Sequence, residues 1–172
     1  MKNTIYTKKG DTGTTTSWSG KTYRKDDSVI EINGVIDETM ASLEKVKYYL
    51  SEEQDPLQHK QISKIIEALY LLGAEISAGK VTDLPKYIDK EYVDKLEYKI
   101  DEMDIKIDTF MTFNTIQGID TSEARTRVRR LERRLTSLFR RGQIRGSVYA
   151  YLNRLSDYLF VLSVYLERLY TK

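Results

Sequence analysis

Lysine, glycine and threonine residues are concentrated near the start of the chain, in an order suited to binding phosphate. The segment reads Thr7-Lys8-Lys9-Gly10-Asp11-Thr12-Gly13-Thr14-Thr15-Thr16. Glycine lets backbone N–H groups approach a phosphate closely, lysine supplies positive charge, and threonine adds hydroxyl donors. The G-x-x-x-x-G-K-[ST] spacing of a Walker A loop is absent. The pattern therefore indicates either a polar glycine-rich turn or a phosphate-binding loop of another kind.

Arginine is concentrated in a later segment, residues 124–134, which reads A-R-T-R-V-R-R-L-E-R-R. Apolar residues at three- and four-residue spacing predict an α-helix here, with one stripe formed by Ala124, Val128, Leu131, Leu135 and Leu138. At 100° per residue, the charged side chains divide into Arg125, Arg129 and Glu132 on one flank, Arg127, Arg130 and Arg134 on the other, and Arg133 nearly opposite the stripe.

Three interpretations of this charged helix stay open at this point. The charges can form a solvated face, a surface for RNA or DNA, or a compact phosphate site, for which the guanidinium fork is well suited. Glu132 favours the phosphate site, because it can orient a neighbouring guanidinium. Asn153 and Asp157 can likewise fix a ligand or bond a neighbouring helix, whereas the single His59 is expected to have a surface or packing role.

The apolar spacing predicts five helices, and hence an all-α bundle, over residues 29–50, 55–78, 89–103, 120–142 and 147–170. Asp55-Pro56 is a typical helix start, and Asp120 followed by Glu123 resembles a capping box that begins the fourth helix. Residues 1–28 and 104–119 are long non-helical segments. The acids of Lys25-Asp26-Asp27 suit the positive end of the first helix dipole.

The last helix has apolar residues on two sides. One side is a leucine series, Leu152, Leu155, Leu159, Leu162, Leu166 and Leu169, and the other carries Phe160, Val161 and Val164. A helix of this kind is usually buried on both sides. We therefore expect it to be either the central helix of the bundle or part of a subunit interface.

Composition narrows the class of protein. A chain of 172 residues is most simply one domain. With 28 basic and 26 acidic residues it lacks the charge excess of a protein that coats nucleic acid or anionic membrane, so an anion site should be local. The absence of cysteine excludes disulfides and thiolate metal sites. No signal-peptide core and no apolar run of ~20 residues is present, so we expect a cytoplasmic protein.

Four motifs, taken in order, resemble one known family. They are I-Y-T-K-K-G-D-T-G-T-T, K-D-D followed by G-V-I-D-E, A-R-T-R-V-R-R-L-E-R-R, and Y-L-N-R-L-S-D-Y-L-F. The chain resembles the ATP:corrinoid adenosyltransferases of the propanediol-utilisation (PduO) type, also called cob(I)alamin adenosyltransferases. The resemblance covers nearly the whole chain.

The resemblance implies a five-helix, ferritin-like bundle that assembles as a homotrimer with ATP bound between subunits. It implies one domain over residues 1–172, in which residues 1–28 form a nucleotide-binding loop and residues 29–172 form the bundle. The implied reaction moves the 5′-deoxyadenosyl group of ATP to the cobalt of cob(I)alamin or another reduced corrinoid, with Mg²⁺, and releases triphosphate. A corrinoid reductase or an adenosylcobalamin-dependent enzyme is the implied protein partner, with no nucleic acid or membrane.

Site residues follow from the same motif positions. The triphosphate loop would contain Thr7, Lys8, Lys9, Gly10, Asp11, Thr15 and Thr16, assisted by Lys25. Arg129, Glu132 and Arg133 would face that loop from the adjacent subunit, and Asn153 would contact the nucleotide. Asp37 would pair with Arg125 across the interface. Because cobalt(I) is itself a strong nucleophile, no protein base is needed. We therefore assign Lys8, Arg129 and Arg133 to stabilising the leaving triphosphate.

Two segments depart from the family pattern. The family's F-x-L-P-G-G, which lies near the corrinoid, is replaced by F-M-T-F-N-T-I-Q-G at residues 110–118, without the proline and paired glycines. Phe110 is the better match to the family's corrinoid-contacting phenylalanine, and Phe113 matches if the loop is realigned. The family's D-E-L-N becomes D-E-T-M at residues 37–40. ATP binding is therefore better supported than corrinoid binding.

Three functions of different classes follow. An adenosyltransferase should form adenosylcobalamin from ATP and reduced cobalamin. A trimeric ATP-binding or sensing protein that has lost transfer should bind nucleotide without product. A nucleic-acid-binding helical bundle should bind oligonucleotides in a salt-sensitive way that survives Lys8→Ala.

Overall fold

The computed structural model describes residues 6, 8–17, 19–51, 53, 55–78, 86–107 and 111–171. A small hairpin precedes five helices, in the order β1 (Thr14–Thr16), β2 (Thr22–Arg24), α1 (Ser28–Tyr49), α2 (Pro56–Ala78), α3 (Lys90–Met103), α4 (Ile116–Arg140) and α5 (Gly146–Tyr170). The expected all-α five-helix bundle is confirmed. The antiparallel pairing of Thr14 with Arg24 and Thr16 with Thr22 was not predicted.

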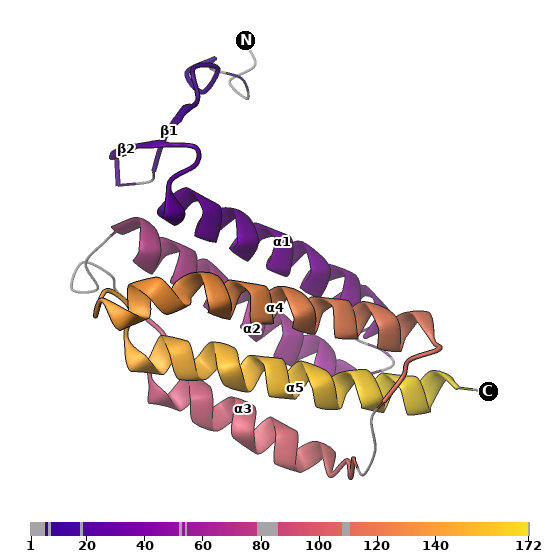
Figure 1. Ribbon diagram of the computed structural model, residues 1–172. Helices are drawn as coiled ribbons and strands as arrows, with labels where there is room; N and C mark the ends of the chain where they lie inside the picture. Colours follow the sequence, from indigo (N-terminus) through magenta and orange to yellow (C-terminus); the bar gives the residue numbers. More distant parts are fainter. Residues whose placement is uncertain are drawn as a thin grey trace.

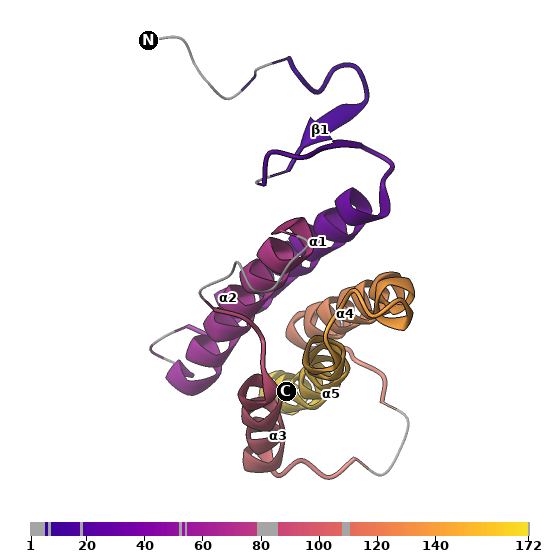
Figure 2. The ribbon, with the colours of Figure 1, turned by 90° about the vertical axis from the view of Figure 1, so that its left-hand side faces the viewer.

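The bundle is built around α4 and α5, which run antiparallel and are joined by a short turn. α5 packs between α4 and α3, while α1 packs against both α4 and α2 (Figure 1). Figure 2 shows α4 and α5 nearly end-on, with α1 and α2 side by side next to them. The hairpin projects beyond the N-terminal end of α1 (Figure 1). Among the described helices, none combines the length and apolar character needed to span a bilayer.

The central position of α5 explains its two apolar sides. Five leucines of the predicted series are fully buried, namely Leu152, Leu155, Leu159, Leu162 and Leu166. The sixth, Leu169, is 56% exposed, so the buried series ends at Leu166. On the other side Val164 is fully buried, whereas Phe160 and Val161 are only partly covered by their own chain. The second side is therefore in part core and in part surface.

The predicted start of the fourth helix is wrong by one turn. α4 begins at Ile116, and its N-cap is Thr115, whose side chain accepts a hydrogen bond from Gly118 N. Asp120 lies inside the helix and is buried, where its carboxylate accepts hydrogen bonds from Lys45 Nζ (2.8 Å) and Tyr49 Oη (2.6 Å) of α1. A carboxylate engaged by another helix cannot cap its own, and Thr115 provides the oxygen instead.

Candidate functional site

The N-terminal loop folds into a tight reversal ahead of the hairpin. Lys8 and Gly13 have positive φ angles of 60° and 81°. The turn is closed by hydrogen bonds from Asp11 N to Lys8 O and from Gly13 N to Gly10 O, both 3.3 Å. Lys8, Lys9 and Asp11 are exposed, while Thr15 is partly covered within β1. The predicted phosphate loop therefore presents its charged side chains to solvent; its first residue, Thr7, lies outside the described residues.

Lys25 is held beside this loop. Its backbone N donates to Gly13 O (2.9 Å), and a Cβ added to Gly10 would lie 3.3 Å from Lys25 Nζ. A side chain at position 10 would therefore crowd the ammonium group, which would have to move by a few tenths of an ångström. The structure thus brings together two elements that the sequence separates by fifteen positions, Gly10 and Lys25. Lys8, Lys9 and Lys25 give the loop a local positive charge.

The arginines on the two flanks of α4 have different surroundings. Arg127 and Arg130 donate to Glu38 on α1 at 3.5 and 2.9 Å. Arg130 and Arg134 also approach Glu31 at 3.5 and 3.4 Å. These ion pairs therefore brace α4 against α1. This flank is not a free basic surface.

The opposite flank holds the charges that were predicted to bind phosphate. Arg129 and Arg133 are exposed, and neither has an ion-pair partner among the described residues. Glu132 Oε1 accepts a hydrogen bond of 3.3 Å from Asn153 Nδ2 on α5. The predicted residues Glu132 and Asn153 are thus brought together, and the two unpaired arginines share their face of the bundle.

Arg125 lies on the same flank in an unusual setting. Its Nε atom is buried without a hydrogen-bond partner, and its guanidinium carbon lies 5.4 Å from the centre of the Phe160 ring. Burial, followed by the nearby charge of Arg129, lowers the pKa of Arg125, and Asp157 acts in the opposite direction. Among the described residues no ion pair joins Arg125 to Asp37, which lies exposed on α1. There it borders a largely apolar groove of about 540 Å³ between α1 and α2, lined by residues including Ile36, Met40, Leu69 and Tyr70.

A single chain does not join the loop to the arginine face. The hairpin extends past the end of α1, away from the middle of α4 and α5 (Figure 1, Figure 2). Within the described part of the chain, no hydrogen bond or ion pair links residues 8–25 to α4 or α5, and the hairpin is instead tied to α2 by Ser19 Oγ donating to Ser77 O (3.0 Å). Among the described residues, the two predicted halves of the nucleotide site are therefore not bonded to each other within one molecule.

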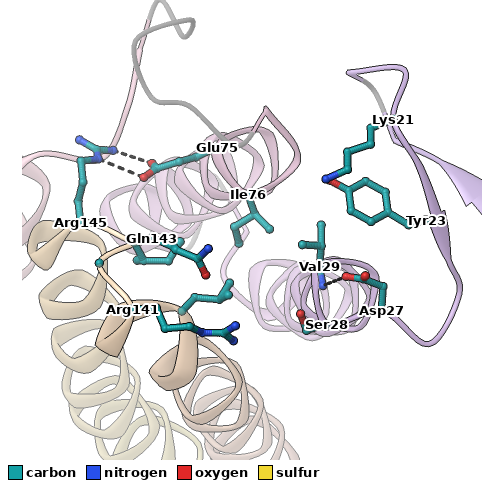
Figure 3. A pocket seen from close by; sticks show the side chains of 13 residues that line it. Lys21, Tyr23, Asp27, Ser28, Val29, Glu75, Ile76, Arg141, Gln143 and Arg145 are labelled. Atoms are coloured by element: carbon teal, nitrogen blue, oxygen red, sulfur yellow. Dashed lines mark hydrogen bonds and ion pairs between the residues drawn. The ribbon is translucent and has the colours of Figure 1, made fainter.

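A separate cavity was not anticipated from the sequence. It has a volume of about 660 Å³ and lies between β2, the start of α1, the end of α2 and the α4–α5 turn. Figure 3 shows Arg141 and Gln143 extending into it, opposite Lys21 and Tyr23. At its edge Arg145 donates to both oxygens of the buried Glu75, at 3.1 and 2.6 Å. A lone carboxylate in the apolar run L-L-G-A-E-I of residues 71–76 is the feature that could have indicated this buried pair.

Comparison with known proteins identifies the family to which this arrangement belongs. The family model described as cobalamin adenosyltransferase matches residues 5–166. The chain belongs to the cobalamin adenosyltransferase family. It is 33% identical over 165 residues to a corrinoid adenosyltransferase of Citrobacter freundii, with 92% of each chain covered. It is also 31% identical over 171 residues to the corrinoid adenosyltransferase MMAB of Homo sapiens, covering 94% of this chain and 68% of that protein.

Solved adenosyltransferases share the fold over nearly the whole length. A phenylalanine-to-histidine variant of a PduO-type ATP:corrinoid adenosyltransferase from Lactobacillus reuteri, complexed with cobalamin and ATP, superposes with a TM-score of 0.84 at 27% identity. That match covers 96% of this chain and 91% of the other. An arginine-to-lysine variant of the same kind of enzyme, complexed with ATP, has a TM-score of 0.83 at 28% identity, with 96% and 95% covered.

The segment before α4 is one of the two places where this chain departs from the adenosyltransferase pattern. Phe110, the expected corrinoid contact, lies outside the described residues. Phe113 is described and partly buried, and one of its ring carbons, Cδ1, would lie 3.1 Å from a Cβ added to Gly118. Phe113 therefore packs against the first turn of α4.

Proposed function

We propose that this chain transfers the 5′-deoxyadenosyl group of ATP to the cobalt of cob(I)alamin or a related reduced corrinoid, which forms adenosylcobalamin and releases triphosphate. The observation that carries the proposal is the likeness, over 96% of the chain, to a family member solved with both cobalamin and ATP. The exposed cations of the loop and of α4 are what an enzyme with a triphosphate leaving group requires.

The chemistry assigns the protein a positioning and electrostatic role. Cobalt(I) attacks C5′ of the ribose, the Co–C bond forms as the C5′–O bond breaks, and both electrons of that bond leave with the triphosphate. No proton has to be moved by the protein. Lys8, Arg129 and Arg133 are exposed cations that can stabilise the charge on the departing oxygen once water is excluded.

We propose that two subunits share each nucleotide site. One contributes the loop residues Thr7, Lys8, Lys9, Gly10, Asp11, Thr15, Thr16 and Lys25, and its neighbour contributes Arg129, Glu132, Arg133 and Asn153. This division is supported by the separation of the loop from the arginine face within one chain. It also gives Arg129 and Arg133 the anionic partner that the described part of their own chain lacks.

The surfaces suited to such an assembly are complementary but different. The α1–α2 groove is apolar and carries the carboxylate of Asp37, whereas the α4–α5 face carries Arg125 beside Phe160. Pairing Asp37 with Arg125 of a neighbour would give this guanidinium, whose Nε atom is buried without a partner among the described residues, a carboxylate to bond. A contact between two different surfaces does not form a two-fold dimer, and it closes into a ring such as a homotrimer when the rotation between subunits closes.

Mg²⁺ would come with the nucleotide rather than with the protein. The described residues contain no group of three or more His, Cys, Asp or Glu side chains arranged to hold a metal ion. Mg²⁺ commonly binds through substrate phosphates with one or two carboxylates, and Asp11 is the carboxylate within the loop. When bound, the ion neutralises triphosphate charge. A reductase partner and a cytoplasmic location stay predictions, as does a single domain over residues 1–172.

The alternative is a trimeric ATP-binding or sensing protein that has lost adenosyl transfer, and the altered 110–118 segment favours it.

An anaerobic assay with ATP and chemically reduced cob(I)alamin separates the two functions when it is combined with calorimetric ATP titration. We expect the absorbance of cob(I)alamin to be replaced by that of a Co–C product, with stoichiometric triphosphate. Adenosine, which lacks the leaving group, is the control and should give no product. ATP binding without product would establish the alternative.

A further inference from the structure

A buried carboxylate near the end of α5 holds the segment that leads into α4. Glu167 is only 6% exposed. Its Oε1 accepts a hydrogen bond from Asn114 N at 2.8 Å, and its Oε2 accepts one from Thr115 N at 3.0 Å. The hydroxyl of Thr115 also donates to Oε2 at 2.6 Å. Three hydrogen bonds to one charged group therefore fix the backbone of two consecutive residues.

The same contact organises the first turn of α4. The Thr115 hydroxyl that donates to Glu167 accepts a hydrogen bond from Gly118 N at 3.1 Å. Gly118 is buried, and a Cβ at this position would overlap Glu167 Oε2. Glycine is therefore required for the carboxylate to reach the helix start. Phe113 packs on the same glycine.

The next residue of α5 holds the other end of the segment. Arg168 donates from Nη2 to Lys106 O at 2.9 Å. Glu167 thus bonds Asn114 and Thr115, which directly follow Phe113, and Arg168 bonds Lys106 earlier in the chain. Two apolar side chains at the adjoining start of α4 face solvent, Ile116 at 60% and Ile119 at 48% exposed. Exposed aliphatic side chains beside an anchored loop are suited to a large ligand with apolar edges.

Burial and hydrogen bonding have opposite effects on the pKa of Glu167. Burial by itself raises the pKa of Glu167, but the hydrogen bonds from Thr115 and Asn114 outweigh it, so the pKa lies below its usual range. The group is therefore charged at neutral pH, at the positive end of the α4 dipole. A charged anchor supplied by α5 can restrain a segment that lacks the proline and paired glycines of its relatives.

We propose that Glu167 is a positioning residue for the corrinoid substrate. Through Asn114 and Thr115 it holds the 111–115 segment and the first turn of α4 in the conformation that receives the corrinoid, and it does not touch ATP. This inference rests on the proposed function, because it names the residue that orients the corrinoid side of the same site.

The test compares Glu167→Gln with Asp120→Asn in the full-length protein. Glutamine keeps the shape of Glu167 but turns one acceptor into a donor facing a backbone N–H. We expect the KM for cob(I)alamin to rise about 10-fold, while the KM for ATP changes less than about twofold. Amide hydrogen exchange at Asn114 and Thr115 should accelerate. Asp120→Asn is the control, because it removes another buried carboxylate contact of α4 and should leave the corrinoid KM unchanged.

Thr115→Val provides a milder variant in case Glu167→Gln fails to fold. It removes the hydroxyl but leaves both backbone hydrogen bonds to Glu167, so a smaller selective rise in corrinoid KM is expected. Equal rises in both KM values, or accelerated exchange with an unchanged corrinoid KM, would overturn the inference and make Glu167 a purely structural cap. If the unaltered protein forms no adenosylcobalamin, the proposed function itself fails, which is a separate outcome.

Discussion

At the residue scale, identical side chains on one helix have different roles because of the flank on which they lie. Arg134 approaches Glu31 on the neighbouring helix at 3.4 Å, whereas Arg129, on the other flank, meets no carboxylate among the described residues. An arginine whose charge is already compensated gains little from a ligand anion. One without a partner is available for the triphosphate.

This contrast predicts the outcome of two matched substitutions. Arg129→Ala should lower kcat/KM for adenosyl transfer by about 100-fold or more, because it removes a cation that stabilises the leaving group. Arg134→Ala should stay within about twofold and should cost less than about 1 kcal/mol of stability, since its ion pair is exposed. Initial rates under anaerobic conditions and thermal unfolding measure both effects. A fully active Arg129→Ala enzyme would show that this arginine lies outside the site.

At the element scale, α4 is held to α1 by a buried carboxylate, Asp120, which the sequence pattern had indicated as a helix cap. Asp120 looks like a helix cap, yet its carboxylate binds Lys45 and Tyr49. Burial alone would raise the pKa of Asp120, but these hydrogen bonds outweigh it and lower the pKa below its ordinary value of 3.8. A carboxyl group whose pKa is lowered by folding stabilises the folded state at pH values above the pKa that it has in the unfolded state. This contribution is lost as the pH falls through the pKa of the folded state.

Asp120→Asn should therefore reduce the free energy of unfolding by about 1–2 kcal/mol at neutral pH. The difference from the unaltered protein should stay constant from neutral pH down to about pH 5 and shrink below about pH 4. Urea unfolding at a series of pH values measures it. Asp94→Asn, which alters the exposed pair of Asp94 with Lys90, is the control and should change stability by less than about 0.5 kcal/mol. A difference that does not depend on pH would rule out the ionised carboxylate as its source.

At the scale of the whole molecule, the proposed function requires a neighbouring subunit, because its site combines the loop of one chain with the arginine face of another. Variants that damage opposite halves should then complement each other. Subunits carrying Lys8→Ala and subunits carrying Arg129→Ala, co-expressed with two different tags and purified through both, should regain activity. Each mixed trimer that carries both tags has one of its three interfaces with both an intact loop and an intact helix, so roughly a third of full activity is expected.

The control for complementation places both substitutions in one subunit. Chains carrying Lys8→Ala and Arg129→Ala together should have no measurable activity alone. If the mixed assemblies of single variants are also inactive although their mass is that of a trimer, each chain would have to build its site by itself. Mass measurement by light scattering checks the assembly directly.

The sequence alone determined the features that depend on neighbours in the chain. Apolar spacing predicted all five helices, because side chains three or four positions apart share a helix face. Four motifs in order indicated the family. The start of α4 was misplaced because several residues there can cap a helix, and the choice between Thr115 and Asp120 depends on α1.

Tertiary structure decided every contact between distant positions. Arg130 and Glu38 are 92 positions apart, and Glu167 is 52 positions from Thr115. No local pattern encodes such pairs, since their formation depends on how whole helices pack against one another. For the same reason the sequence could nominate Arg129 and Arg133 for phosphate binding, but only the packed bundle distinguished them from the arginines that brace α1.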